Sequence, residues 1–261
     1  MTRTYVVTGS ATGIGRATAL KLREDGHRVI GVDLFGADIN VDLTNAEGRD
    51  ELVAQATELS GGIIDGALAI ADRMRPSSET VSVNHFGAVA TLEGLRPLLS
   101  LSDAPRAAVV ATLVALEEVD SQLLQLIEAG DEAAALAYAD QLVSDVTPLG
   151  SSVLFTTSKQ SVARWARQAA TRPEWVGEGI ALNVVAPGRA FTSMTAGALE
   201  TDEGRAAHGR DEAVRAGELT GDASHVANLL AWLTSEDNGY VTGQVIYADG
   251  GAESTRRPAL V

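Results

Sequence analysis

The sequence predicts an α/β fold organised around a parallel, doubly wound sheet, and three observations support this prediction. Short β-branched runs alternate with amphipathic stretches of helical length along most of the 261 residues. A glycine-rich turn, "TGSATGIG", joins the first apolar run to the first helical stretch. The chain has no internal repeat and no proline-rich linker, so we expect a single domain spanning residues 1–261.

The predicted elements can be justified in chain order. Residues 4–9 form a β-branched run that ends in glycine, which is typical of a buried strand, and residues 14–26 then show helical spacing up to Gly26. Further strands are predicted at residues 27–34, 63–70, 106–115, 181–188 and 243–251, with a short strand before Asp42. Further helices are predicted at residues 45–59, with Asn45 as N-cap, at 78–99, and around Lys159.

Two stretches depart from this alternation. Residues 116–145 have helical periodicity and a turn at Gly130 but no strand, so we interpret about 116–147 as a helical insertion before the Lys159 helix. Residues 192–219 are polar and rich in alanine and glycine. Their composition fits a mobile lid over a site and a solvated pair of helices equally well.

Composition excludes several classes of function. The formal charge of −15 disfavours binding to nucleic acid and to anionic membranes. The absence of cysteine excludes disulfide scaffolds and cysteine-based sites, and neither an HExxH nor a GxSxG motif is present, so we expect no metal. No apolar run approaches about 20 residues and the N-terminus lacks a signal-peptide layout, which predicts a cytoplasmic protein.

The glycine-rich turn predicts a phosphate-binding site. Gly9 permits a tight turn, and Gly13 and Gly15 allow a phosphate group to approach the backbone at a helix N-terminus. Asp33 lies 18 residues after Gly15, at the end of the second strand, where a carboxylate accepts both hydroxyls of an adenosine ribose and repels a 2′-phosphate. This favours NAD over NADP. Asp42 either meets the adenine edge or is an ordinary loop aspartate.

Several motifs together resemble those of the short-chain dehydrogenase/reductase family. They are "TGSATGIG", "SVNHFGA", a lysine four residues after an aromatic residue, "NVVAPGRAFT" and "ADGG", and the insertion is similar to that of the branch containing bacterial 3α-hydroxysteroid dehydrogenase/carbonyl reductase. The resemblance implies a seven-stranded Rossmann-type sheet, a homodimer or homotetramer, and NAD(P) bound at the carboxyl edge of the strands. The cofactor-binding residues implied are Gly9, Thr12, Gly13, Ile14, Gly15, Asp33, Leu34, Asp42, Leu43, Ala71, Lys159, Pro187, Gly188 and Thr192.

The family's catalytic tetrad of Asn, Ser, Tyr and Lys is only partly present. Asn84 matches the asparagine, which holds a water in the proton relay, although an asparagine bonded to the backbone is an alternative. Lys159 matches the lysine, which binds the nicotinamide ribose. Phe155 stands at the tyrosine position and Leu113 at the serine position. Thr192, which the resemblance places near the nicotinamide carboxamide, is equally suited to be a helix N-cap.

These replacements remove the usual proton donor. Phenylalanine cannot donate a proton, and loss of a general acid typically lowers a rate by about 10²–10⁴-fold. Loss of the serine hydrogen bond lowers it by about 10²–10³-fold, by analogy with oxyanion donors. A family glycine that lies against the cofactor is replaced by Asp72, whose carboxylate is either offset by Arg73, Arg75 or Lys159, or turned to solvent.

Three functions therefore remain open. The first is a NAD-dependent oxidoreductase acting on alcohols or ketones with altered efficiency, and the second is a catalytically inactive NAD-binding partner or sensor protein. The third is a lyase or isomerase that reuses the pocket. The third is suggested by Asp72 together with the apolar Leu113 and Phe155, which would reshape the pocket for a hydrophobic ligand. We expect the substrate or ligand to be an apolar small molecule.

Overall fold

The computed structural model describes residues 1–145, 150–188, 190–191 and 221–259. Its main strands are β1 (Thr4–Thr8), β2 (Arg28–Asp33), β3 (Ile39–Asn40), β4 (Gly66–Ala69), β5 (Arg106–Val110), β6 (Ala181–Pro187) and β9 (Val245–Ala248). They form one seven-stranded sheet in the order β3-β2-β1-β4-β5-β6-β9, with every neighbouring pair parallel. The predicted doubly wound sheet is thereby confirmed. The strand order reverses between β1 and β4, which is where such sheets bind ligands.

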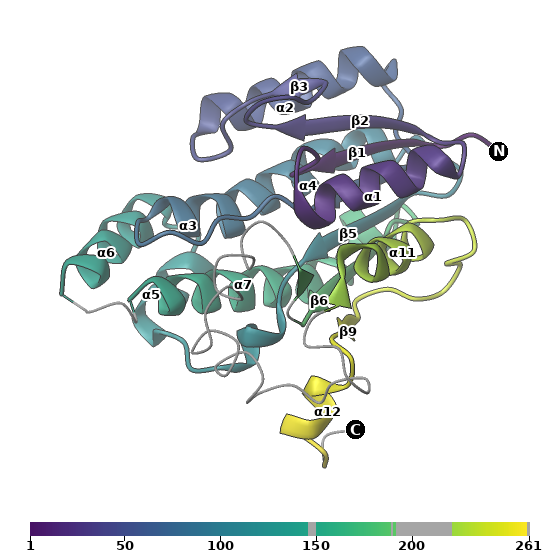
Figure 1. The fold of residues 1–261 in the computed structure, drawn as a ribbon. Coiled ribbons are helices and arrows are strands. Elements are labelled where there is room, and N and C mark those ends of the chain that lie inside the picture. Colours follow the sequence, from purple (N-terminus) through teal and green to yellow (C-terminus); the bar gives the residue numbers. More distant parts are fainter. Residues whose placement is uncertain (146–149, 189, 192–220, 260–261) are drawn as a thin grey trace.

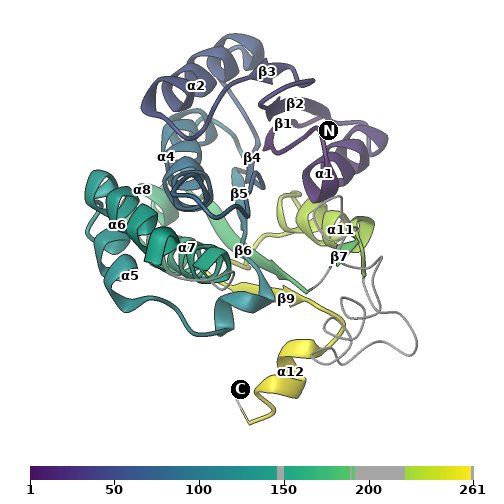
Figure 2. The same cartoon turned by 60° about the vertical axis from the view of Figure 1, so that its left-hand side comes forward.

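Helices cover both faces of this sheet (Figures 1 and 2). On one face lie α1 (Gly13–Glu24) and α11 (Ala223–Leu233), and on the other lie α2 (Ala46–Ser60), α4 (Ala88–Leu99) and α7 (Gly150–Ala169). Successive strand residues point to opposite faces, so Val6 belongs to the core beneath α2 and α4, and Val7 to the core beneath α1 and α11. Both faces are therefore apolar, as expected of a parallel sheet.

The stretch predicted as one helix at residues 78–99 is divided. It begins as α3 (Glu79–Val81), continues as a π-helical segment (Ser82–Gly87) and ends as α4. Gly87 packs closely on the loop after β3, because a Cβ there would lie 3.1 Å from the Leu43 carbonyl oxygen. The predicted N-cap of α2 is observed, since the side chain of Asn45 accepts a hydrogen bond from the Gly48 amide at 2.9 Å.

Two helices, α5 (Ser121–Glu128) and α6 (Glu132–Asp145), occupy the insertion, and they turn at Gly130, whose φ is 75°. The hairpin has its own apolar cluster with α3 and α7, made by residues including Val81, Leu123, Ile127, Ala135 and Leu154. The elements not yet named are a 3-10 helix (Leu113–Leu116), α8 (Pro173–Val176), α12 (Ala252–Arg256), and the paired short strands β7 (Ala190–Phe191) and β8 (Gly221–Asp222). The stretch predicted as a lid, residues 192–219, lies outside the described residues.

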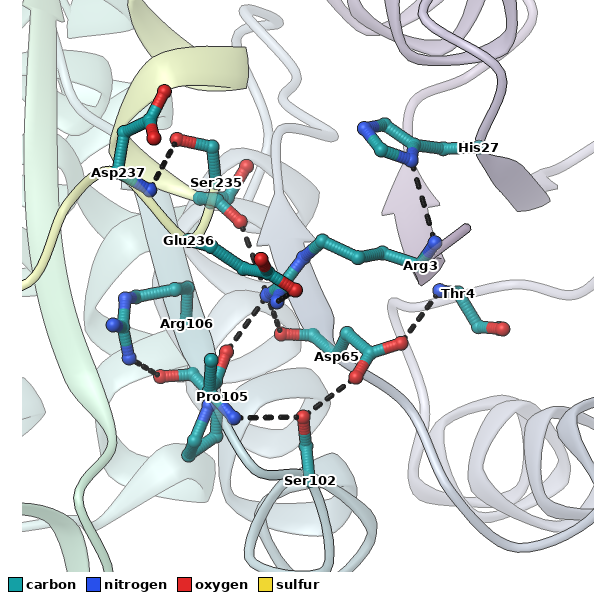
Figure 3. Close-up of polar contacts among 12 residues, drawn as sticks. Arg3, Thr4, His27, Asp65, Ser102, Pro105, Arg106, Ser235, Glu236 and Asp237 are labelled. Carbon is teal, nitrogen blue, oxygen red and sulfur yellow. Dashed lines mark hydrogen bonds and ion pairs between the residues drawn. The ribbon is translucent and has the colours of Figure 1, made fainter. Parts of the chain in front are cut away.

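A buried arginine connects the amino-terminal edge of the sheet to the end of α11 (Figure 3). The Arg3 guanidinium donates to the carbonyl oxygens of Asp65 at 2.9 Å, Ala104 at 2.7 Å and Thr234 at 3.3 Å, and it lies 3.5 Å from the Glu236 carboxylate. Carbonyl groups that lie just outside the strands and α11 therefore share Arg3 as a hydrogen-bond donor. In the described ranges, no helix has the length and apolar character needed to cross a membrane.

Candidate functional site

A cavity of about 500 Å³ opens at the carboxyl edge of the sheet, around the point where the strand order reverses. The predicted cofactor-binding residues that line it are Gly9, Thr12, Gly13, Ile14, Gly15, Asp33, Leu34, Asp42, Leu43, Ala71, Pro187 and Gly188. The other two predicted contacts are Lys159, which is buried behind the cavity wall, and Thr192, which lies outside the described residues. The walls come from the carboxyl ends of β1 to β6, from the segments that follow these strands, and from α7.

The glycines of the glycine-rich turn are required by close backbone packing as well as by their place in the cavity wall. Gly9 has a φ of 70°, and a Cβ there would lie 2.9 Å from the Ala71 Cα atom. A Cβ on Gly15 would lie only 2.1 Å from the Gly9 carbonyl oxygen. Gly15 is therefore required for the first turn of α1 to pack against the loop that precedes it, whereas the sequence had suggested only an approach to phosphate.

The start of α1 fits the phosphate groups of a dinucleotide. Thr12, the N-cap residue, makes no side-chain capping bond, and the residues from Thr12 to Gly15 line the cavity. The first amides of a helix lack intrahelical partners and carry partial positive charge, so this end of α1 offers donors to an anion.

Asp33 fits a ribose at the neighbouring wall. Its carboxylate accepts hydrogen bonds from the Ala11 amide at 3.0 Å and from the Leu34 amide at 2.8 Å, which fixes its orientation. Each carboxylate oxygen has a further lone pair for a hydroxyl group. In the sheet, β2 and β6 are four strand spacings apart, about 19 Å, so the cavity suits an elongated ligand with one end near Asp33.

The loop after β4 is held by two buried polar side chains. The Thr8 hydroxyl accepts from the Ile70 and Ala71 amides, each at 3.0 Å. The Asn84 amide group accepts from the Arg73 amide at 2.7 Å and donates to the Arg73 carbonyl at 2.9 Å. Asn84 thus adopts the backbone-bonded arrangement foreseen as an alternative, and it does not line the cavity. Its effect is to fix the segment that carries Asp72.

Asp72 and Lys159 form an ion pair at the end of the cavity that lies beyond β4 and β5. The Lys159 side chain is 1% exposed, and its ammonium group donates to the Val110 carbonyl at 2.9 Å and lies 3.3 Å from the Asp72 carboxylate. The Phe155 ring centroid is 5.8 Å from the same ammonium, as expected for residues one helical turn apart on α7. Asp72 lines the cavity, so a carboxylate, with the lysine behind it, faces the ligand space.

At the position predicted for the family serine, the residues on either side of Leu113 line the cavity in its place. Leu113 is buried and does not line the cavity, whereas Thr112 and Val114 do. The predicted strand 106–115 stops at Val110, because the chain turns into the 3-10 helix that Thr112 caps. The Thr112 hydroxyl accepts from the Val114 amide at 3.4 Å and is the polar group that this segment presents to the cavity.

None of the four tyrosines, all of which lie in described parts of the chain, offers a phenol to the cavity. Tyr138, on the inserted hairpin, donates to Asp120 at 3.5 Å, and burial together with Asp120 raises its pKa. Tyr5 donates to the Thr234 carbonyl at the opposite edge of the sheet, and Tyr240 is exposed. Tyr247 contacts Arg257. No tyrosine lines the cavity.

Sequence reasoning missed several lining residues. They include Met74, Val110, Val114 and Glu117. Glu117 also lies 3.3 Å from the Arg256 side chain, so the carboxyl-terminal α12 borders the cavity. These residues lie at the end of β5 or in the segments that follow β4 and β5, which is the available signal, but their side-chain directions depend on loop geometry. Among the described residues, no three His, Asp or Glu side chains are grouped to hold a metal ion.

Comparison with known proteins gives consistent results over nearly the whole chain. A family model described as Enoyl-(Acyl carrier protein) reductase matches residues 122–253. The 3-alpha-hydroxysteroid dehydrogenase/carbonyl reductase of Comamonas testosteroni is 30% identical over 258 residues, covering 97% of each chain.

Solved structures agree with this relationship. The 3-alpha-hydroxysteroid dehydrogenase from Pseudomonas sp. B-0831, crystallised with NADH, is 31% identical with a TM-score of 0.88 and covers 99% of this chain and 100% of its own. Levodione reductase, at 21% identity and a TM-score of 0.75, covers 97% of this chain and 98% of its own, and it shares the fold.

Proposed function

The chain belongs to the short-chain dehydrogenase/reductase family, and from this membership we propose that it is an NAD(H)-binding oxidoreductase that acts slowly on an apolar alcohol or ketone. One observation carries the proposal. A single cavity is lined at one end by residues suited to the adenosine and phosphates of a dinucleotide, from Gly9 to Asp33, and at the other end by Phe155, where the family has a tyrosine. We call this second end the reacting end. The relative crystallised with NADH supports the choice of ligand.

Asp33 supports NAD rather than NADP. Its carboxylate is fixed by two backbone amides and faces the cavity, where it would accept ribose hydroxyls and repel a 2′-phosphate. The nearby cavity wall at Leu34, Asp42 and Leu43 contains no arginine that would offset a phosphate.

The reacting end determines the expected rate. Bound NAD(H) would supply the hydride chemistry, and the residues here orient the ligand, exclude water and transfer a proton. Phe155 contributes an apolar wall, and the hydroxyl groups of Thr112 and Thr156 are the neutral donors that line this end. Hydroxyls of this kind are poor acids near neutral pH, so proton transfer should limit the rate.

A second candidate function is a non-catalytic NAD(H)-binding partner or sensor. The ion pair between Asp72 and Lys159 favours it, because the ammonium that family members direct to the cofactor is here engaged by a carboxylate. Under this hypothesis the protein binds NADH and responds to it without turnover.

The deciding experiment titrates the protein with NADH, with and without a panel of apolar ketones, and follows cofactor fluorescence and absorbance together. We expect saturable NADH binding, preferred over NADPH, and slow oxidation of NADH by a ketone. Phe155→Tyr, which places a phenol at the cavity wall, should raise that rate by about 10²-fold or more. Binding without turnover in the wild type, with turnover only in the Phe155→Tyr variant, would support the sensor instead. Absence of NADH binding would refute both.

A further inference from the structure

Arg49, on α2, connects three parts of the molecule that are distant in sequence. Its side chain is buried, and its Nε atom donates to the Leu43 carbonyl at 2.8 Å. A second nitrogen donates to the Ser82 hydroxyl at 2.9 Å, at the start of the π-helical segment. The same guanidinium makes two hydrogen bonds, at 2.7 and 2.8 Å, to the carboxylate of Glu132 at the start of α6.

The loop that Arg49 holds is a wall of the cavity. Asp42 and Leu43 line the cavity at the end reached by β2 and β3, which lies away from Phe155 and Pro187 in the strand order. The Ser82 hydroxyl donates to the Thr44 carbonyl at 2.7 Å, so the same loop is anchored a second time. Because Arg49 also donates to that hydroxyl, both anchors of this wall involve the guanidinium.

Glu132 determines where the guanidinium lies. A buried cation is tolerated when an ionic partner with good geometry compensates its lost hydration, and the two parallel bonds to Glu132 provide that geometry. Without the carboxylate, the guanidinium would move toward water and withdraw its donors from the loop. Glu132 belongs to the inserted hairpin, which packs beside α3 and α7 (Figure 1).

We propose that Glu132 is a positioning residue which, through Arg49, sets the adenosine-binding wall at Asp42 and Leu43, so that the inserted hairpin determines dinucleotide affinity. The proposal rests on the proposed NAD(H) site. It implies that changes in the hairpin alter the affinity for a ligand that contains adenosine, and do not alter the affinity for a ligand that contains only the nicotinamide nucleotide.

The test uses the full chain with Glu132→Gln, which preserves side-chain shape and removes charge. Glu128→Gln is the matched control, because Glu128 lies on the same hairpin and pairs with Arg164 in an exposed contact. NADH affinity is measured by fluorescence, and AMP and NMN are each used to displace NADH. We expect Glu132→Gln to weaken NADH and AMP binding by about threefold to thirtyfold, as for residues that couple through an intermediate, and to leave NMN unchanged.

Hydrogen exchange without ligand provides an independent measurement. The Thr44 amide donates to the Asp42 carboxylate at 2.9 Å, and its exchange should accelerate in Glu132→Gln and not in Glu128→Gln. Equal weakening of AMP and NMN, or unchanged Thr44 exchange, would overturn the proposal by showing a general loss of structure or no coupling. If the wild type fails to bind NADH, the proposed function fails first, and the exchange result still decides whether Glu132 holds the loop.

Discussion

At the scale of single residues, the ion pair between Asp72 and Lys159 separates this site from the arrangement that the family pattern implies. Of the alternatives for Asp72, offset by a cation or turned to solvent, the structure shows pairing with Lys159. Asp72 is held in place indirectly by Asn84, which bonds both backbone groups of Arg73. The lysine is thus retained in a new setting, as the buried partner of a carboxylate that faces the cavity.

Asp72→Asn should therefore lower the stability of the unliganded protein. The substitution leaves the buried Lys159 ammonium without its ionic partner, and because Asp72 is itself partly exposed, we expect a loss of about 1–2 kcal/mol rather than the full value for a buried pair. Urea unfolding at neutral pH measures the difference. Glu128→Gln, which breaks an exposed pair, should change stability by less than about 0.5 kcal/mol. Equal stability of Asp72→Asn and wild type would show that the pair does not hold the lysine.

His85 gives a pH dependence of known sign. Burial, and secondarily the nearby Arg49 cation, lowers the pKa of His85 from 6.5 to about 4, and its Nδ1 atom lies 2.9 Å from the Ser161 hydroxyl. The unfolded chain binds a proton at this residue below about pH 6.5 and the folded protein does not, so its stabilising effect is complete above pH 6.5 and is lost as pH falls toward 4.

We expect this group to remove about 2 kcal/mol of stability between pH 7 and pH 5. Denaturant unfolding at the two pH values, compared between wild type and His85→Gln, isolates the contribution of His85 from that of the many carboxylates. The glutamine variant should lose less stability on acidification. An identical pH dependence in the two proteins would contradict a neutral, buried His85.

At the scale of elements, periodicity was sufficient to predict the seven strands and most of the helices, because apolar runs of strand length alternate with helical stretches. It failed where local geometry changes without a change in pattern. The π-helical segment has nearly the same apolar spacing as an α-helix, so nothing in the sequence separated Ser82–Gly87 from its flanks. Likewise the run from Arg106 to Ala115 is apolar throughout, although β5 ends at Val110.

The candidate site also contains some residues that the sequence pattern predicts and others that it does not. The positions of Gly9 and Asp33 in the cavity wall could be predicted, because parallel strands end at one edge of the sheet. Residues whose role depends on side-chain direction could not be predicted. Thr112 rather than Leu113 reaches the cavity, and Glu132 contacts Arg49 across 83 positions of sequence, a pairing that no local pattern indicates.

At the scale of the whole molecule, the two edges of the sheet have separate tasks. The carboxyl edge carries the cavity, whereas the amino edge is held together by the Arg3 network (Figure 3). We expect Arg3→Lys to destabilise the protein by about 2–4 kcal/mol, because an ammonium cannot reach the Asp65, Ala104 and Thr234 carbonyls and the Tyr5 hydroxyl together. Thermal and urea unfolding measure this loss.

The matched control for that variant is Arg23→Lys, since Arg23 pairs with Asp38 on the exposed surface and should tolerate the change within about 0.5 kcal/mol. NADH affinity, measured below the unfolding transition, should be the same in Arg3→Lys and wild type. A weakened affinity without loss of stability would show that the two edges are coupled after all.

The contact between Gly15 and the Gly9 carbonyl has an evolutionary consequence. Any larger side chain at position 15 would collide with the preceding loop whether or not a dinucleotide is present. A descendant of this protein that had abandoned its coenzyme would consequently still be selected to keep that glycine for folding alone. The glycine motif would then persist after the activity was lost, because the packing of the loop against the helix still requires it.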